Sequence, residues 1–311
     1  IKAEVTQKTL AVTGDGIVFA SNTSTLPITG LAEASSRPAN FIGLHFFSPV
    51  DKMPLVEIIR GEQTSDETLA RAMDYVQRIA KTPIVVNDSR GFYTSRVFGT
   101  YAREGMAMLA EGIAPALIEN AGRMAGMPVG PLAVSDEVSI ELMHKVATQT
   151  KADLGGAYEA PVGEDVMEAM VSKLGRMGRK AGGGFYEYPK DDRKRLWPGL
   201  ADAFPLAADQ PDVEEVKERL LYVQAIETAR CVEEGVLTNA ADGDIGSLLG
   251  WGFPPHTGGT LSLIDMIGSA DFTAACDRLA QAHGPRFTPP KILRDMAALN
   301  ARFHDDSKIA A

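Results

Sequence analysis

The amino-acid sequence predicts an α/β region followed by an all-α region. In residues 1–88, short apolar runs typical of strands alternate with helix signals, which favours a layered α/β domain. From residue 92 onward, long helical patterns replace the strand signals almost completely. A polar stretch with several prolines, residues 189–211, interrupts these patterns and predicts a linker.

Four apolar runs in the first region predict strands. They are GIVFA at 16–20, FIGLHFF at 41–47, LVEIIR at 55–60 and IVV at 84–86. Between the last two runs, residues 64–81 predict an amphipathic helix, because their apolar side chains recur at helical spacing. Thr64 and Glu67 suggest a capping box at its start, and Pro83 ends it.

The two helical segments of the all-α region resemble each other. Glu104 precedes EGI and Glu227 precedes EGV, in both cases with a separation of seven residues. GMPVGPLAVSD at 126–136 then corresponds to GFPPHTGGTLSLID at 252–265, which is three residues longer. We interpret the segments as two copies of one helical module. The predicted boundaries are 89–188 for the first module, 189–215 for the linker and 216–311 for the second module.

Charge and composition exclude several classes of protein. The 311 residues carry a net charge of −10 without a long run of Lys or Arg, so we expect no nucleic-acid partner. No apolar run approaches the roughly 20 residues of an integral membrane segment. Only Cys231 and Cys276 are present, without a Cys/His cluster. This argues against a structural zinc site and favours a reducing, cytoplasmic location.

His45 and Glu57 are titratable residues in two otherwise apolar runs. His45 lies near the carboxyl end of its predicted strand, the edge at which ligands collect in doubly wound sheets. The loop with Pro49 and Pro54 could bring Glu57, on the next strand, to His45. A carboxylate bonded to one ring nitrogen leaves the other free to take a proton from a substrate hydroxyl. The alternative is a satisfied core histidine and a solvated glutamate.

Two further motifs allow a functional and a structural interpretation. SNTST at 21–25 follows a predicted strand, so Asn22 and Ser24 could lie at a carboxyl edge, or the motif could cap a helix at LPITGLAEA. DSRGFYTSR at 88–96 predicts a strand-to-helix turn with Phe92 and Tyr93 in the core. The glycine-rich AGGGFYEY matches neither common phosphate-binding motif, and we interpret it as structural.

Several motifs together resemble those of a known family. FASNTS, GLHFFSPV, PLVEII, RGFYTSR, GMPVGPL and GGGFYEY occur in the order and spacing of the 3-hydroxyacyl-CoA dehydrogenase family. More narrowly, the chain resembles the dehydrogenase half of a multifunctional fatty-acid β-oxidation α subunit, because the short monofunctional enzymes carry one helical module per chain. The resemblance covers nearly the whole sequence.

The resemblance implies an activity and roles for particular residues. The reaction is the oxidation of a (3S)-3-hydroxyacyl-CoA to the 3-oxoacyl-CoA, with hydride passing to NAD⁺. His45 matches the general base and Glu57 its partner, while Ser24 matches the serine that hydrogen-bonds the reacting oxygen. Asn22 matches a residue on the nicotinamide side, and Lys2 matches a lysine that contacts the cofactor.

Two positions depart from the family pattern. The family usually has Asn where this chain has Ser48, which would contact the cofactor, and Ser95, which would contact the acyl-CoA. Serine keeps a donor and an acceptor but has a shorter reach. We expect activity to survive, because a hydroxyl replaces an amide in both places.

The glycine turn that binds a dinucleotide is absent from the sequence. No GxGxxG occurs in residues 1–311, and the resemblance places it upstream of Ile1, with a hydratase domain further upstream. The first residues, IKAEVTQKTL, resemble the middle of a helix and suggest an N-terminally incomplete chain. Residues 1–88 are therefore expected to form the second half of an NAD-binding Rossmann-like domain.

Two other functions remain open at this level. The helical modules could act mainly as a non-catalytic docking platform for a thiolase subunit or for self-association. Alternatively, the chain could belong to a dehydrogenase of a 3-hydroxy acid without CoA. A docking platform needs no imidazole at position 45, and only a CoA-dependent enzyme is inhibited by free CoA.

Residues 1–311 alone are expected to bind NAD⁺ weakly, because they lack the glycine turn that binds its pyrophosphate. Isothermal titration calorimetry of NAD⁺ into the purified chain measures this directly, with a titration into buffer as the control. Tight binding by the isolated chain would contradict the expectation.

Overall fold

The computed structural model describes residues 1–305, and the chain forms two compact units. The first unit combines residues 1–98 with the chain from residue 225 onward, and the second comprises residues 99–224. The sheet region and the last helices, which are far apart in the sequence, therefore belong to one unit.

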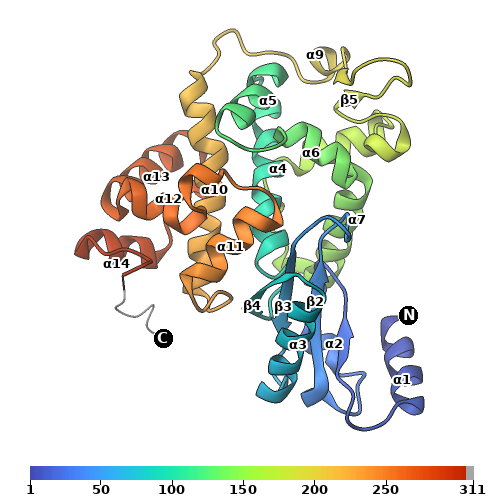
Figure 1. Cartoon of the computed structure of the whole chain (residues 1–311). Helices are drawn as coiled ribbons and strands as arrows, with labels where there is room; N and C mark the ends of the chain where they lie inside the picture. Colours follow the sequence, from blue (N-terminus) through green and yellow to red (C-terminus); the bar gives the residue numbers. More distant parts are fainter. Residues whose placement is uncertain (306–311) are drawn as a thin grey trace. The chain divides into compact units, whose positions relative to one another are not determined.

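The sheet of the first unit has four strands, each overlapping one of the predicted apolar runs (Figure 1). They are β1 (Phe19–Ser21), β2 (Phe41–Phe46), β3 (Leu55–Arg60) and β4 (Thr82–Asn87), in the spatial order β1-β2-β3-β4. β1 and β2 are parallel, β2 and β3 are antiparallel, and β3 and β4 are parallel. The α/β prediction for this region is confirmed.

Helix α3 (Asp66–Arg78) covers one face of this sheet. Its Ala72 and Val76 pack against apolar side chains of β2 and β3, which form one buried cluster. The predicted capping box is wrong, because the cap is one residue later. Ser65 Oγ accepts from Thr68 N at 3.2 Å, whereas Thr64 Oγ1 donates to the carbonyl oxygen of a β2 residue at 2.6 Å.

Two further helices precede β2: α1 (Lys2–Val12) and α2 (Ile28–Ala32). The structural alternative for SNTST, a cap for α2, is wrong. Its N-cap residue is Pro27, without a side-chain bond, and the carboxylate of Asp88 instead accepts from the first two N–H groups of the helix at 2.8 and 2.7 Å. A residue sixty positions away thus replaces the local cap.

The first unit ends in helices that follow the end of α10 (Val213–Glu233). They are α11 (Ala240–Gly250), α12 (Thr260–Ile267), α13 (Ser269–His283) and α14 (Lys291–Leu299). Helix α11 lies against β3 and β4, and Asp242 Oδ2 accepts from Val85 N at 3.1 Å. Tyr93 donates its hydroxyl proton to Gly243 O at 2.6 Å, and burial raises the pKa of this phenol, which keeps it a donor.

The second unit is mostly helical. Its elements are the main part of α4 (Thr94–Ala110), α5 (Pro115–Met124), α6 (Pro131–Val138), α7 (Ile140–Leu154), α8 (Glu164–Glu168), a two-stranded ribbon of β5 (Tyr186–Glu187) with β6 (Arg195–Leu196), and α9 (Leu200–Ala203). The predicted linker thus contains a short strand and a helical turn. The glycine-rich AGGGFYEY, residues 181–188, contains β5, as expected for a structural segment. Across residues 1–305, no helix is both long and apolar enough to cross a bilayer.

Gly246 on α11 is expected to resist substitution because a Cβ there would lie 2.7 Å from the Tyr93 ring and 2.9 Å from Ile84. Gly246→Ala should lower the free energy of unfolding by about 1–3 kcal/mol through overpacking. Gly30→Ala in α2 is the matched control, because its added methyl group meets nothing within 4 Å. Urea unfolding measures both variants, and equal stabilities would contradict this packing.

Candidate active site

An acid–histidine pair forms where β2 and β3 run antiparallel. His45 and Glu57 are directly opposite in the register, so their side chains project from the same face of the sheet. His45 Nδ1 lies 2.8 Å from Glu57 Oε2. His45 is 5% exposed and Glu57 is completely buried. The structure therefore brings together the two residues that the sequence placed on neighbouring strands.

The carboxylate of Glu57 accepts four hydrogen bonds. Oε1 accepts from the backbone N–H groups of Tyr93 and Thr94, both at 3.0 Å. Oε2 accepts from the Thr94 hydroxyl at 2.6 Å and pairs with His45 Nδ1. A carboxylate has about four acceptor sites, so all are used. The backbone donors lie at the start of α4, where helix N–H groups have no partner within the helix.

The tautomer of His45 follows from these contacts. Because Glu57 Oε2 is an acceptor, Nδ1 carries a proton and Nε2 of the neutral ring is left as an acceptor. Nε2 has no hydrogen-bond partner in residues 1–305. In the same part of the chain, the only side-chain nitrogen or oxygen that is fully buried without a partner is Thr13 Oγ1, so Nε2 keeps contact with solvent. Nε2 is therefore the atom of the pair that is not bound by the protein.

A left-handed turn positions the start of α4 against Glu57. Gly91 has φ +77° and Phe92 has φ +51°, a conformation that is uncommon for a bulky residue and typical of functional turns. Phe92 and Tyr93 are both fully buried, which confirms the sequence expectation for them. The His45 ring also packs beside Phe47, with centroids 4.6 Å apart.

The predicted cofactor residues gather only in part. Lys2 Nζ donates to Ser21 Oγ at 3.2 Å and to the Asn22 carbonyl oxygen at 3.0 Å. Asn22 Oδ1 accepts from Phe46 N at 3.3 Å, so Asn22 connects the ends of β1 and β2 beside His45. Lys2 and Asn22 thus lie at the carboxyl ends of β1 and β2, near His45.

The three predicted serines lie in separate segments. Ser24 is exposed in the bend after β1, Ser48 is exposed just after β2, and Ser95 is half-buried in the first turn of α4. No hydrogen bond within the described part of the chain joins any of them to His45 or Glu57. Their proposed contacts are with ligands.

A cavity in residues 1–305 is lined by neither His45 nor Glu57, although Asn22 contributes to it. It has a volume of about 660 Å³ and is lined by side chains of β1, β2 and α3, including Leu44 and Phe46. Because side chains alternate along a strand, these two residues point to the face opposite His45.

Thr94 and two backbone N–H groups are contacts that the sequence did not identify. The motif RGFYTSR indicated a helix start, but the residue expected to matter there was Ser95. The hydroxyl directly before Ser95 was the available signal. Its contact with Glu57 depends on a turn that brings residues 36 and 37 positions away from Glu57 to the acid.

Comparison with known proteins gives two family matches. Residues 1–89 match the model described as "3-hydroxyacyl-CoA dehydrogenase, NAD binding domain", and residues 91–188 match "3-hydroxyacyl-CoA dehydrogenase, C-terminal domain". Together these matches span well over half of the chain.

Curated relatives and solved structures agree with these matches. The chain is 40% identical over 294 residues to the fatty acid oxidation complex subunit alpha of Shewanella amazonensis, covering 94% of this chain and 41% of the relative. The equivalent subunit of Shewanella frigidimarina is 39% identical over 309 residues, covering 98% of this chain and 43% of the relative. The chain therefore spans about two fifths of the length of these relatives.

The solved structure of (S)-3-hydroxybutyryl-CoA dehydrogenase PaaH1 from Ralstonia eutropha is 36% identical, with a TM-score of 0.56, and the match covers 61% of this chain and 66% of that one. A 3-hydroxybutyryl-CoA dehydrogenase from Escherichia coli has a TM-score of 0.78 over 96% of this chain and 79% of its own. At 22% identity, this second likeness shows the fold alone.

Removal of the Glu57 carboxylate is expected to destabilise the protein, because it leaves buried N–H and O–H donors of residues 93 and 94 without an acceptor. Glu57→Ala should lower the free energy of unfolding by about 3–5 kcal/mol. Glu62→Ala, at an exposed acid in the following loop, should change it by no more than about 0.5 kcal/mol. Similar urea midpoints for the two variants would contradict the buried network.

Proposed function

Because the chain belongs to the 3-hydroxyacyl-CoA dehydrogenase family, we propose that it supplies the acid–histidine pair for NAD-dependent oxidation of a (3S)-3-hydroxyacyl-CoA in fatty-acid β-oxidation. The observation that carries the proposal is the buried His45–Glu57 pair near the carboxyl ends of β1 and β2, with Nε2 left in contact with solvent. The activity belongs to the natural polypeptide that contains residues 1–311.

The chemistry of the pair fits the oxidation of a secondary alcohol. The substrate loses a proton from its hydroxyl oxygen and a hydride from the adjacent carbon, and the product is a ketone. NAD⁺, when bound, accepts the hydride. His45 Nε2 accepts the proton, and the Glu57 carboxylate, 2.8 Å from Nδ1, accepts the hydrogen bond of the other ring nitrogen. The buried contacts of Glu57 keep the ring in the orientation that exposes Nε2.

The residues at the ends of β1 and β2 fit one end of NAD. Asn22 is exposed, and its amide nitrogen has no partner in residues 1–305, so it can donate to a ligand on the nicotinamide side. Lys2 places a positive charge beside it, and Ser48 adds an exposed hydroxyl after β2. Because the sequence contains no GxGxxG, these residues fit the nicotinamide end and not the pyrophosphate.

Ser24 and Ser95 are proposed to contact the substrate. The exposed hydroxyl of Ser24 follows β1 and would hydrogen-bond the reacting oxygen, while Ser95 follows Thr94 and would contact the acyl-CoA. In this proposal, residues 1–88 are the second half of a Rossmann-like domain. Residues 89–188 and 216–311 are the two helical modules, joined by 189–215.

Reciprocal ion pairs support the proposal of two module copies. Arg96 Nη2 donates to Glu234 at 2.8 Å and the same guanidinium pairs with Glu227. With the roles exchanged, Arg219 donates to Glu104 at 2.8 Å and to Glu111 at 2.7 Å. Arg96 precedes Glu104 by eight residues, and Arg219 precedes Glu227 by the same number. Such an exchange is the rule between the copies of a twofold-symmetric homodimer, and duplication reproduces it within one chain.

Buried carboxylates bind helix starts in the same way in both copies. Glu119 Oε1 accepts from the backbone N–H groups of Leu132 at 2.7 Å and Ala133 at 3.3 Å, at the start of α6. Asp244 does the same at the start of α12, where Leu261 donates at 2.8 Å. The pKa of both carboxyl groups is raised, because the effect of burial is larger than the opposing effect of these hydrogen bonds.

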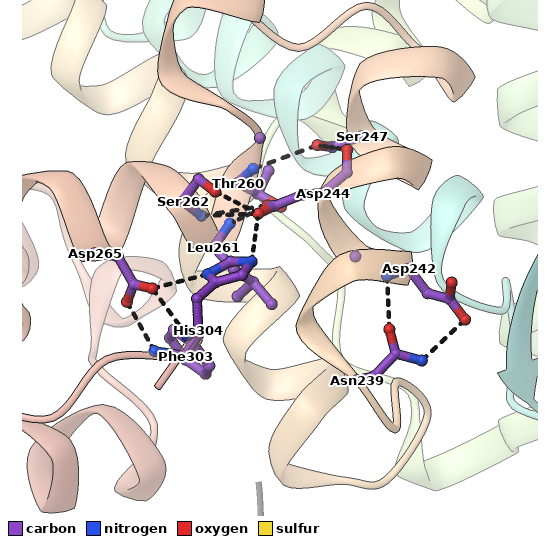
Figure 2. A network of polar contacts seen from close by, with 12 residues as sticks. Asn239, Asp242, Asp244, Ser247, Thr260, Leu261, Ser262, Asp265, Phe303 and His304 are labelled. Atoms are coloured by element: carbon purple, nitrogen blue, oxygen red, sulfur yellow. Dashed lines mark hydrogen bonds and ion pairs between the residues drawn. The ribbon is translucent and has the colours of Figure 1, made fainter. Parts of the chain in front are cut away.

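A second aspartate in each copy binds the segment that follows the helices. Asp136 accepts from the backbone N–H groups of Phe185 and Tyr186, both at 2.8 Å. Figure 2 shows the counterpart, in which Asp265 accepts from Phe303 at 2.8 Å and His304 at 3.1 Å.

In each copy, a side chain of this following segment contacts the carboxylate that binds the helix start. Tyr186 donates its hydroxyl proton to Glu119 at 2.7 Å, and His304 Nε2 lies 3.1 Å from Asp244. Because residues of the two copies correspond contact by contact, we infer a duplicated module in which a histidine replaces the tyrosine.

The relatives named as subunits of a fatty acid oxidation complex support an assembled state. We propose that the natural polypeptide joins such a complex, with a thiolase subunit as partner, and acts in the cytoplasm. Self-association through the helical modules is a second route to assembly. A purely docking role is disfavoured by the acid–histidine pair, which docking does not require.

His45→Asn is expected to lower kcat for the oxidation of a 3-hydroxyacyl-CoA by about 10²–10⁴-fold, because the proton loses its acceptor. The assay uses the natural polypeptide that contains residues 1–311. His256→Asn, at an exposed histidine after α11, is the matched control and should leave kcat unchanged. Full activity of His45→Asn would contradict the catalytic role and favour the docking function.

A further inference from the structure

We propose that Thr94 is a positioning residue of the dehydrogenase reaction, whose hydroxyl fixes the Glu57 carboxylate in the orientation that His45 requires. The inference rests on the proposed function of the acid–histidine pair. Thr94 is 1% exposed, so it acts through Glu57 and not through direct contact with a ligand.

The Thr94 hydroxyl and His45 share one oxygen of Glu57. Thr94 Oγ1 donates to Oε2 at 2.6 Å, the shortest of the four contacts of the carboxylate, and lies 3.5 Å from His45 Nδ1. Short O–H···O⁻ contacts to a charged acceptor are the stronger kind of hydrogen bond. The hydroxyl thus lies directly beside the bond between the acid and the histidine.

The hydroxyl selects one arrangement of the carboxylate. Thr94 has a single hydroxyl proton, which it donates in a hydrogen bond to Oε2. The Thr94 hydroxyl therefore cannot also donate to His45 Nδ1. The Nδ1 proton of His45 must then go to Oε2 as well, because Oε1 is occupied by two backbone N–H groups. Rotation of the carboxylate would break the bonds on both oxygens. The tautomer that leaves Nε2 free is therefore the one that satisfies every donor.

The proposed second module offers an internal comparison. Arg96 corresponds to Arg219, so Thr94 corresponds to Lys217 two residues earlier. Lys217 pairs with Glu214 on its own helix at 2.8 Å. The helical module therefore does not require a buried hydroxyl at this position. The hydroxyl occurs in the copy whose helix begins at the acid–histidine pair.

Thr94→Val and Thr94→Ser separate the hydroxyl from the packing of the side chain. Valine keeps the shape and removes the donor, while serine keeps the donor and removes a methyl group. We expect Thr94→Val to lower kcat by about 10–100-fold with KM changed by less than about twofold, as for misplacement of a catalytic group. Thr94→Ser should retain kcat within about threefold.

Proton NMR of the His45 ring gives a readout that needs neither substrate nor cofactor. The Nδ1-bound proton should give a slowly exchanging downfield resonance in the wild type and in Thr94→Ser. It should be shifted or lost in Thr94→Val. If the methyl group has a structural role, the resonance should instead be shifted or lost in Thr94→Ser. Melting temperatures of all variants identify any loss of folding.

The outcomes distinguish this inference from the proposed function. Wild-type kcat and an unchanged resonance in Thr94→Val, together with an inactive His45→Asn, would overturn the role of Thr94 alone. A fully active His45→Asn would overturn the proposed function. If Thr94→Val does not fold, Thr94→Ser still tests the inference. A loss of kcat and of the resonance in Thr94→Ser would show that the methyl group matters and not the hydroxyl.

Discussion

The hydrogen bond between His45 Nδ1 and Glu57 Oε2 is the interaction on which the proposed chemistry depends. A buried carboxylate is stable only when its oxygens have partners, and here the partners come from the start of a helix. The helix start thus satisfies the acid, and the acid in turn orients the imidazole. The proposed function depends on His45 Nε2, which has no hydrogen-bond partner within residues 1–305.

The C-terminal helices contribute to this site from a distant part of the sequence. Tyr93, whose N–H group binds Glu57, places its hydroxyl on a carbonyl oxygen of α11 and its ring against Gly246. Only glycine, which has no Cβ, allows α11 to lie this close to the Tyr93 ring. Helix α11 therefore packs directly on the element that positions the acid.

The strands could be predicted because they depend on local pattern. The pattern alone left a core histidine as the alternative to the acid–histidine pair, and the resemblance to the family favoured the pair. Apolar runs mark β2 and β3, and two residues on adjacent strands of a hairpin meet when the register places them opposite each other. The caps could not be predicted in the same way. Asp88 replaces a local cap at α2 because the end of β4 lies beside that helix, and such a contact depends on tertiary structure. Thr94 could not be predicted for the same reason, since its hydroxyl binds an acid 37 positions earlier.

The most direct test of the acid–histidine pair is a crystal structure of the natural polypeptide containing residues 1–311 with NAD⁺ and a 3-hydroxyacyl-CoA. We expect the substrate hydroxyl to lie about 2.6–3.2 Å from His45 Nε2, or one water molecule away, with Glu57 still bound to Nδ1. A substrate hydroxyl bound elsewhere, with Nε2 turned toward the protein, would contradict this assignment.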